Sequence, residues 1–215
     1  MADVMVIAPH PDDESIGCGG SICLHRQKGQ SLHVVFLTSG ELGLKDLPRE
    51  EAWKVREEEA RRAAEILRLT ELTFLRLRDW YLGDSVEEAA NRLRPYLARE
   101  KPSLLYLPHP GEWHPDHRAV LPIVRTALKQ AGDMPLELRA YEVWTPLSEY
   151  DRAEDITSVM RRKLRAVACY ASQTRQFRYD RAVRGLSEYR GALAAHCRYA
   201  EVFQQCQVPV ESIGE

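Results

Sequence analysis

Apolar runs of strand length alternate with longer amphipathic stretches along this chain. Five strands are predicted, at Val4–Ala8, Leu32–Thr38, Leu72–Leu77, Ser103–Leu107 and Leu138–Trp144. Helices are predicted at about Ser15–Lys28, Arg49–Leu69, Asp84–Arg99, Pro115–Gln130, Ile156–Tyr170 and Asp180–Phe203. Because the strands are apolar throughout rather than alternating, we expect helices on both faces of the sheet. The predicted fold is a three-layer α/β/α sandwich with a mostly parallel, Rossmann-like sheet, as one domain over residues 1–215.

Polar segments directly follow three of the predicted strands. They are His10–Glu14, Ser39–Glu41 and His109–His117. In a parallel α/β sheet the carboxyl ends of the strands share one edge, and ligands bind there. We therefore expect these three segments to meet at that edge.

Composition narrows the class of protein. The 215 residues are 44% hydrophobic and 29% charged, which is typical of a soluble globular protein. The net charge of −2 gives no general electrostatic reason to bind nucleic acid or an anionic membrane. No apolar run approaches the roughly 18–20 residues of a membrane span. The first strand begins at once, which leaves no room for a signal peptide, so a cytoplasmic protein with reduced cysteines is expected.

The segment VIAPHPDDESIGCGG at residues 6–20 raises the question of nucleotide binding. The dinucleotide fingerprint G-x-G-x-x-G requires a third glycine that is missing after Gly17 and Gly19, and no phosphate-binding G-x-x-x-x-G-K-[ST] loop occurs. We interpret the glycines as structural, since small residues let a helix lie close to the sheet. The two adjacent aspartates either cap the helix that follows or, together with His10, bind a divalent metal ion.

The segment GEWHPDH at residues 111–117 favours the metal. Pro115 suits the first position of a helix, which places His114 and His117 in its first turn, close to one face. Four of the seven histidines thus fall on two loops at the predicted edge, opposite the aspartates. A mixed histidine and carboxylate set is typical of catalytic zinc sites.

These two motifs, P-H-P-D-D-E and H-P-D-H, together resemble the LmbE-like or PIG-L family of zinc-dependent N-acetylglucosaminyl deacetylases. Three further segments are similar to that family: VREEEARRAAEILRL at 55–69, KLRAVACYASQ at 163–173 and YRGALAAHCRYAEVF at 189–203. The last resembles the branch that acts in the bacillithiol pathway. The resemblance implies an LmbE-type fold and hydrolysis of an N-acetylated amino sugar to acetate and a free amine. Some family members are homo-oligomers, so self-association is a further expectation.

The resemblance also implies roles for individual residues. His10, Asp13 and His117 would bind one zinc ion, and Asp12 would be the general base. His114, in its protonated form, would stabilise the oxyanion or act as the acid, oriented by Asp116. Fe²⁺ and Co²⁺ are alternatives to Zn²⁺ because histidine and aspartate sites select weakly among these metals.

Other residues near the predicted edge are candidates for contact with the substrate. Arg56 lies on the sheet-facing stripe of its helix, and we expect it to contact substrate, the alternative being a salt bridge to Glu59 or Glu41. Glu14 and His109 are further candidate substrate contacts. A tyrosine often precedes the H-P-D-H motif by two positions in the family; here the residue is Glu112, whose role is open. Trp113 either stacks on a sugar or packs.

Two other classes of function compete with a deacetylase. A metal-dependent phosphoesterase normally needs two metal ions and more carboxylates than this one compact set supplies. A binding protein with a structural zinc would need four ligands, mostly sulfur, and no cysteine lies beside the histidine motifs. The sequence therefore favours an amide hydrolase.

Overall fold

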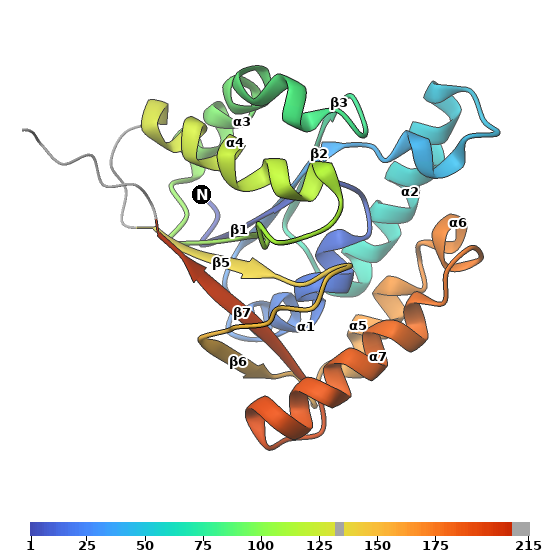
Figure 1. The fold of residues 1–215 in the computed structure, drawn as a ribbon, viewed down its shortest axis with the longest axis vertical. Helices are drawn as coiled ribbons and strands as arrows, with labels where there is room; N and C mark the ends of the chain where they lie inside the picture. Colours follow the sequence, from blue (N-terminus) through green and yellow to red (C-terminus); the bar gives the residue numbers. More distant parts are fainter. Residues whose placement is uncertain (132–135, 208–215) are drawn as a thin grey trace, which may run out of the picture.

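A computed structural model describes residues 1–131 and 136–207, and its strands form one twisted sheet (Figure 1). The strands are β1 (Val4–Ala8), β2 (Leu32–Thr38), β3 (Glu71–Leu77), β4 (Leu104–Pro108), β5 (Glu137–Tyr141), β6 (Arg152–Asp155) and β7 (Ala200–Cys206). Their order is β3-β2-β1-β4-β5-β7-β6. Strands β1 to β5 run parallel to one another, whereas β7 runs antiparallel to both β5 and β6.

Helices cover both faces of the sheet, which confirms the predicted three-layer α/β/α fold. The helices are α1 (Asp13–Gln27), α2 (Arg49–Leu67), α3 (Val86–Glu100), α4 (Pro115–Ala131), α5 (Met160–Val167), α6 (Ala171–Thr174) and α7 (Tyr179–Arg190). In β1, Val4 and Val6 pack in the core that includes α1, α2, α5 and α7, whereas Met5 and Ile7 pack with α3 and α4. Figure 1 shows α3 and α4 together on one side of the sheet. None of the described helices is both long and apolar enough to cross a membrane.

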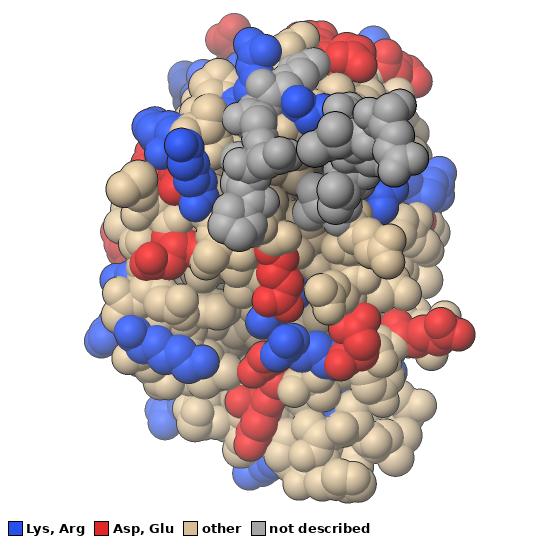
Figure 2. Space-filling model, turned by 90° about the vertical axis from the view of Figure 1, so that its left-hand side faces the viewer, with Lys and Arg blue, Asp and Glu red and all other residues tan. Residues whose placement is uncertain are grey.

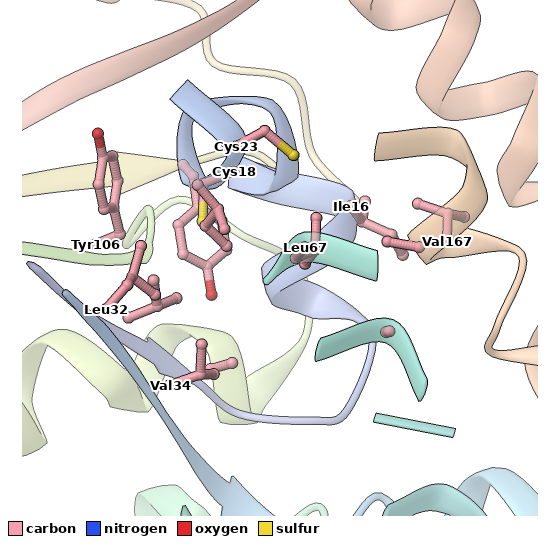
Figure 3. Packing of buried hydrophobic residues seen from close by; sticks show 14 of the residues in the cluster. Ile16, Cys18, Cys23, Leu32, Val34, Leu67, Tyr106 and Val167 are labelled. Carbon is pink, nitrogen blue, oxygen red and sulfur yellow. The ribbon is translucent and has the colours of Figure 1, made fainter. Parts of the chain in front are cut away.

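Helix α1 lies against its neighbours so closely that the glycines have a structural role, as predicted. A Cβ atom added to Gly17 would lie 2.1 Å from Cδ2 of Tyr141, and one added to Gly20 would lie 2.6 Å from Cγ2 of Ile156. Figure 3 shows Ile16, Cys18 and Cys23 of this helix in the packed core, with Val167 beside Ile16.

A buried carboxylate from β7 holds the middle of α1. The helix is kinked at Cys18, where φ is −133°. Glu201 accepts hydrogen bonds from the N–H groups of Gly20 (2.7 Å) and Ser21 (2.8 Å). Lys163 of α5 completes this buried contact, with its Nζ 2.7 Å from Oε1 of Glu201. The last strand and the first helix are thereby joined through two charged side chains.

The C-terminal third differs from the prediction. The helix predicted over Asp180–Phe203 ends as α7 at Arg190, followed by the π-helical turn η3 (Gly191–Ala195), and His196 then adopts a left-handed φ of 50°. The chain continues as β7, so the predicted helix is wrong beyond residue 195, and strand β6 was missed. The helix predicted over Ile156–Tyr170 is the shorter α5. Short apolar runs are compatible with either helix or strand, and only the antiparallel partners of β7 decide between them.

The fifth strand ends earlier than predicted for a specific reason. Its prediction ran to Trp144, but β5 ends at Tyr141 because the next N–H groups bond elsewhere. The carboxylate of Glu112 accepts hydrogen bonds from the N–H groups of Val143 (2.7 Å), Trp144 (3.1 Å) and Thr145 (3.1 Å).

On the face shown in Figure 2, basic and acidic side chains are intermingled, in agreement with the small net charge.

Candidate active site

A groove of about 1030 Å³ lies over the carboxyl ends of β1, β2, β3 and β4. All three polar segments singled out in the sequence contribute to its lining: His10, Asp12 and Asp13 after β1, Gly40 after β2, and His114 after β4. The convergence at this edge follows from the parallel strand order, since β1 lies between β2 and β4.

The turn between β1 and α1 is strained. Asp12 has a φ of 122°, which is rare for any residue other than glycine. The turn is held by the N–H of His10, which donates to Oδ2 of Asp13 (2.9 Å), and by the N–H of Asp12, which donates to Glu14 (3.1 Å). The chain thereby presents two consecutive aspartates to the groove. Strain at a single residue of a binding loop is typical of a functional site.

His10 is buried among carboxylates that contact both of its ring nitrogens. Nδ1 lies 3.2 Å from Oδ2 of Asp13, while Nε2 lies 3.1 Å from Oδ1 of Asp79 and 3.2 Å from Oδ2 of Asp116. Burial alone lowers the pKa of His10, but the charge of Asp79 and the bonds to Asp116 and Asp13 raise it well above its usual value. A metal-binding histidine normally has its second nitrogen on a carboxylate.

Among the described residues, neither ring nitrogen of His117 has a hydrogen-bond partner, although the side chain is completely buried. Its Nε2 lies 3.3 Å from Oδ2 of Asp13, the same oxygen that contacts His10, and its Nδ1 lies 3.8 Å from Oε2 of Glu112. A buried imidazole without a partner is unfavourable unless a ligand satisfies it. The donor set around Asp13 therefore fits a divalent metal ion with nitrogen and oxygen ligands.

His114 completes the group of imidazoles. Ligand atoms of His10, His114 and His117 lie within 4.8 Å of one another. Nδ1 of His114 accepts a hydrogen bond from the N–H of Asp116 (3.2 Å), and the ring of Trp80 packs edge-on at 4.5 Å between centroids. Burial, together with the charges of His10 and His117, lowers the pKa of His114 to about 4. This environment favours the neutral imidazole near neutral pH, whereas the family resemblance implied the protonated form.

Asp12 is the carboxylate best placed to act as a base. It is buried in the groove wall, and Oδ2 lies 3.2 Å from Nη2 of Arg56. Burial raises the pKa of Asp12 to about 7, with Arg56 opposing the rise and Asp13 adding to it. A general base works best when its pKa is close to the working pH.

Arg56 pairs most closely with Asp12, and it also makes the longer salt bridge to Glu59 that was one of the two alternatives expected from the sequence. Its Nη2 also donates to the carbonyl of Pro11, while Nη1 lies 3.9 Å from Glu59. Glu41 instead accepts a hydrogen bond from Nε1 of Trp53 (3.1 Å). Arg56 lines the groove and holds Asp12 there.

The other predicted site residues lie behind the groove surface. The carboxylate of Asp116 accepts hydrogen bonds from the N–H groups of Trp80 (2.7 Å) and Leu82 (3.0 Å) and contacts His10, so it orients His10. Its hydrogen bond to His114 is made by the backbone N–H. Glu14 accepts hydrogen bonds from Tyr170 (2.6 Å), Ser15 and the N–H of Asp12. Nε2 of His109 lies 2.7 Å from the carbonyl of Thr145. Neither Glu14 nor His109 is among the residues that line the groove.

Two important carboxylates were not assigned a role from the sequence. Asp79 follows the end of β3, contacts His10 and accepts a hydrogen bond from the N–H of Leu42 (2.8 Å). The rule that polar residues at strand ends form the site would have found it, had it also been applied to this strand. Glu112, whose role was open, organises the loop after β5 and faces Nδ1 of His117.

The Rossmann-like sheet, with histidines and aspartates clustered at its carboxyl edge, is that of an α/β protein with a candidate metal site. The profile of the PIG-L family, described as GlcNAc-PI de-N-acetylase, matches residues 5–128. This chain belongs to that family, as the two sequence motifs predicted.

Individual relatives cover most of the chain. Diacetylchitobiose deacetylase of Thermococcus kodakarensis is 32% identical over 92% of this chain and 80% of its own length. A probable N-acetyl-α-D-glucosaminyl L-malate deacetylase 2 of Bacillus subtilis is 34% identical over 80% of this chain and 83% of its own length. The structure of N,N'-diacetylchitobiose deacetylase from Pyrococcus horikoshii aligns with a TM-score of 0.83 and 26% identity, over 95% of this chain and 84% of the other.

Proposed function

We propose that this protein is a metal-dependent deacetylase that hydrolyses the acetamide of an N-acetylglucosamine derivative to acetate and a free amine. The observation that carries the proposal is the position of Asp12. Asp12 lies in the groove wall and is paired with Arg56. In the sequence it stands between His10 and Asp13, in one strained turn. The names of the related enzymes support an acetylated amino sugar as the substrate.

We assign the metal to His10, Asp13 and His117, with Zn²⁺ as the expected ion. The fit rests on the unpartnered nitrogens of His117 and on the shared oxygen of Asp13, which both histidines approach. A bound divalent cation supplies a Lewis acid that polarises a carbonyl and lowers the pKa of water towards about 7. Asp79 and Asp116 would fix the tautomer of His10, and Glu112 would face the outer nitrogen of His117.

Two side chains have separate roles in the proposed reaction: Asp12 transfers the proton, and His114 donates a hydrogen bond. Asp12 takes a proton from the attacking water and later delivers it to the leaving amine. Its pKa of about 7 allows both steps near neutral pH. His114 accepts a hydrogen bond at Nδ1, so its neutral form carries hydrogen on Nε2 and can donate it to the developing oxyanion. In this proposal His114 donates as a neutral imidazole, whereas the family resemblance implied the protonated form.

A phosphoesterase is not favoured by this geometry. A second metal site would have to use Asp79 and Asp116, the other carboxylates around His10. Both already accept backbone hydrogen bonds, from Leu42 in one case and from Trp80 and Leu82 in the other. The site therefore offers one good ligand set rather than two.

The proposal is tested by measuring free amine released from N-acetylglucosamine derivatives by zinc-loaded protein. We expect release by the native protein, and a loss of about 100-fold or more with Asp12→Asn. Metal content, measured on both proteins, should stay at one ion per chain. If no derivative yields amine although the metal is bound, the proposed deacetylase activity is refuted.

A further inference from the structure

Large apolar side chains gather at the mouth of the groove. Trp113 is 53% exposed, Phe177 49% and Trp80 47%, and all three line the groove. Leu42 and Leu47, which line it too, are also exposed. Apolar groups concentrated around one concave site mark a place where a ligand is bound.

Four of the aromatic rings form a continuous wall, which we call the aromatic wall: Trp113, Trp144, Phe177 and Tyr179. Ring centroids are 6.0 Å apart between Trp113 and Trp144, 5.8 Å between Trp144 and Phe177, and 5.7 Å between Phe177 and Tyr179. The wall begins beside the proposed catalytic centre, since Trp113 lies 5.4 Å from the ring of His114. It therefore extends outward from the point where the acetamide would be cleaved.

Positive charge is scarce along the same groove. Within the described part of the chain, the only lysine or arginine side chains in its lining are those of Arg56 and Lys45. Arg56 is bonded to Asp12 and Pro11. Its Nε and Nη1 atoms have no hydrogen-bond partner among the described residues, but they are buried and the side chain is only 3% exposed. Lys45 is exposed and is followed by Asp46, which also lines the groove. A dicarboxylate such as malate is normally held by an accessible arginine fork, and this groove presents none.

We infer that the group attached to the N-acetylglucosamine ring of the substrate is uncharged and lays an apolar face on Trp113 and Phe177. The inference rests on the proposed deacetylase function and specifies its substrate class. A second pyranose ring or an alkyl chain has the required chemistry. Either would cover the exposed aromatic surface without bringing a carboxylate towards Asp12, Asp13 and Asp79.

The test compares kcat/KM for amine release from four substrates by the zinc-loaded protein: N,N'-diacetylchitobiose, octyl N-acetylglucosaminide, free N-acetylglucosamine and its malate glycoside. We expect one of the two uncharged glycosides to exceed both the free sugar and the malate glycoside by about tenfold. Trp113→Ala and Phe177→Ala should each reduce this preference, mainly by raising KM. Tyr189→Ala removes an aromatic ring that is 56% exposed outside the groove, and should leave all four values unchanged.

The outcomes separate the inference from the function on which it rests. The best uncharged substrate shows whether a pyranose or an alkyl group covers the wall. Preference for the malate glycoside would overturn the inference and leave the deacetylase standing. The inference would also fall if the Trp113 and Phe177 variants kept the native preference. No amine from any of the four substrates would instead count against the proposed function.

Discussion

Arg56 of α2 and Asp12 of the β1–α1 turn form a buried ion pair, with Nη2 3.2 Å from Oδ2. Both side chains are almost inaccessible to solvent. The pair joins a helix after β2 to the turn after β1. It thereby sets the position and the charge of the proposed general base.

Replacing Arg56 should damage both stability and turnover. Arg56→Met leaves the Asp12 carboxylate buried without its partner, and we expect the free energy of unfolding to fall by about 3–5 kcal/mol. Turnover should fall about 100-fold, since the base is no longer held in place. Arg61→Met is the matched control on the same helix. The Arg61 side chain is about half exposed, and its partner Glu57 also binds Arg76, so the substitution should change stability by less than about 1 kcal/mol. Denaturant unfolding and amine release measure the two effects; full activity in Arg56→Met would contradict the assigned role.

The proposed metal ligands should be separable from the proposed base. His10→Ala and His117→Ala should lose the metal, whereas Asp12→Asn and His114→Ala should retain it with low activity. His25→Ala serves as control, because His25 contacts Gln30 and Tyr106 instead of the groove. Elemental analysis after gel filtration gives the metal content per chain. Loss of metal from Asp12→Asn would mean that Asp12, rather than Asp13, is the ligand.

Asp79 should tune metal affinity without binding the metal. Its bond to Nε2 of His10 fixes the ring. Burial raises the pKa of Asp79, but the charge of His10 and the hydrogen bonds from His10 and the N–H of Leu42 together lower it to about 2. Asp79→Asn should weaken zinc binding about 10- to 100-fold. Asp46→Asn removes a carboxylate from the same groove that has no contact with His10, and should leave affinity unchanged. Competition with a chromogenic chelator measures both; equal affinities in the two variants would exclude the supporting role of Asp79.

Two glycine substitutions should have opposite effects on stability. A Cβ at position 17 would overlap the ring of Tyr141, so Gly17→Ala should destabilise the fold by about 1–3 kcal/mol or more. At Gly185 of α7 nothing lies within 4 Å of an added Cβ, and Gly185→Ala should stabilise the helix by up to about 1 kcal/mol. Thermal unfolding of both variants provides the comparison. A neutral Gly17→Ala would show that α1 can move away from the sheet.

Site residues that stand together in short motifs could be predicted from the sequence. Pairs of residues that lie far apart in the sequence could not. His10 to Asp13 and His114 to His117 stand in short motifs after strands, so their meeting at one edge follows from a parallel sheet. The pairing of Arg56 with Asp12 joins residues 44 positions apart and has no local signal. Likewise, β7 reads as a continuation of α7, and only its pairing with β5 and β6 makes it a strand.

The contact between Glu201 and α1 can form only after nearly the whole chain has been synthesised. This carboxylate belongs to β7, yet it caps the N–H groups of Gly20 and Ser21 within the helix that carries Asp13. On the ribosome, α1 emerges about 180 residues before its cap. Until β7 leaves the exit tunnel, these N–H groups lack their partner, and Lys163 lacks its counter-ion. The first segment to be translated is thus among the last to reach its final packing.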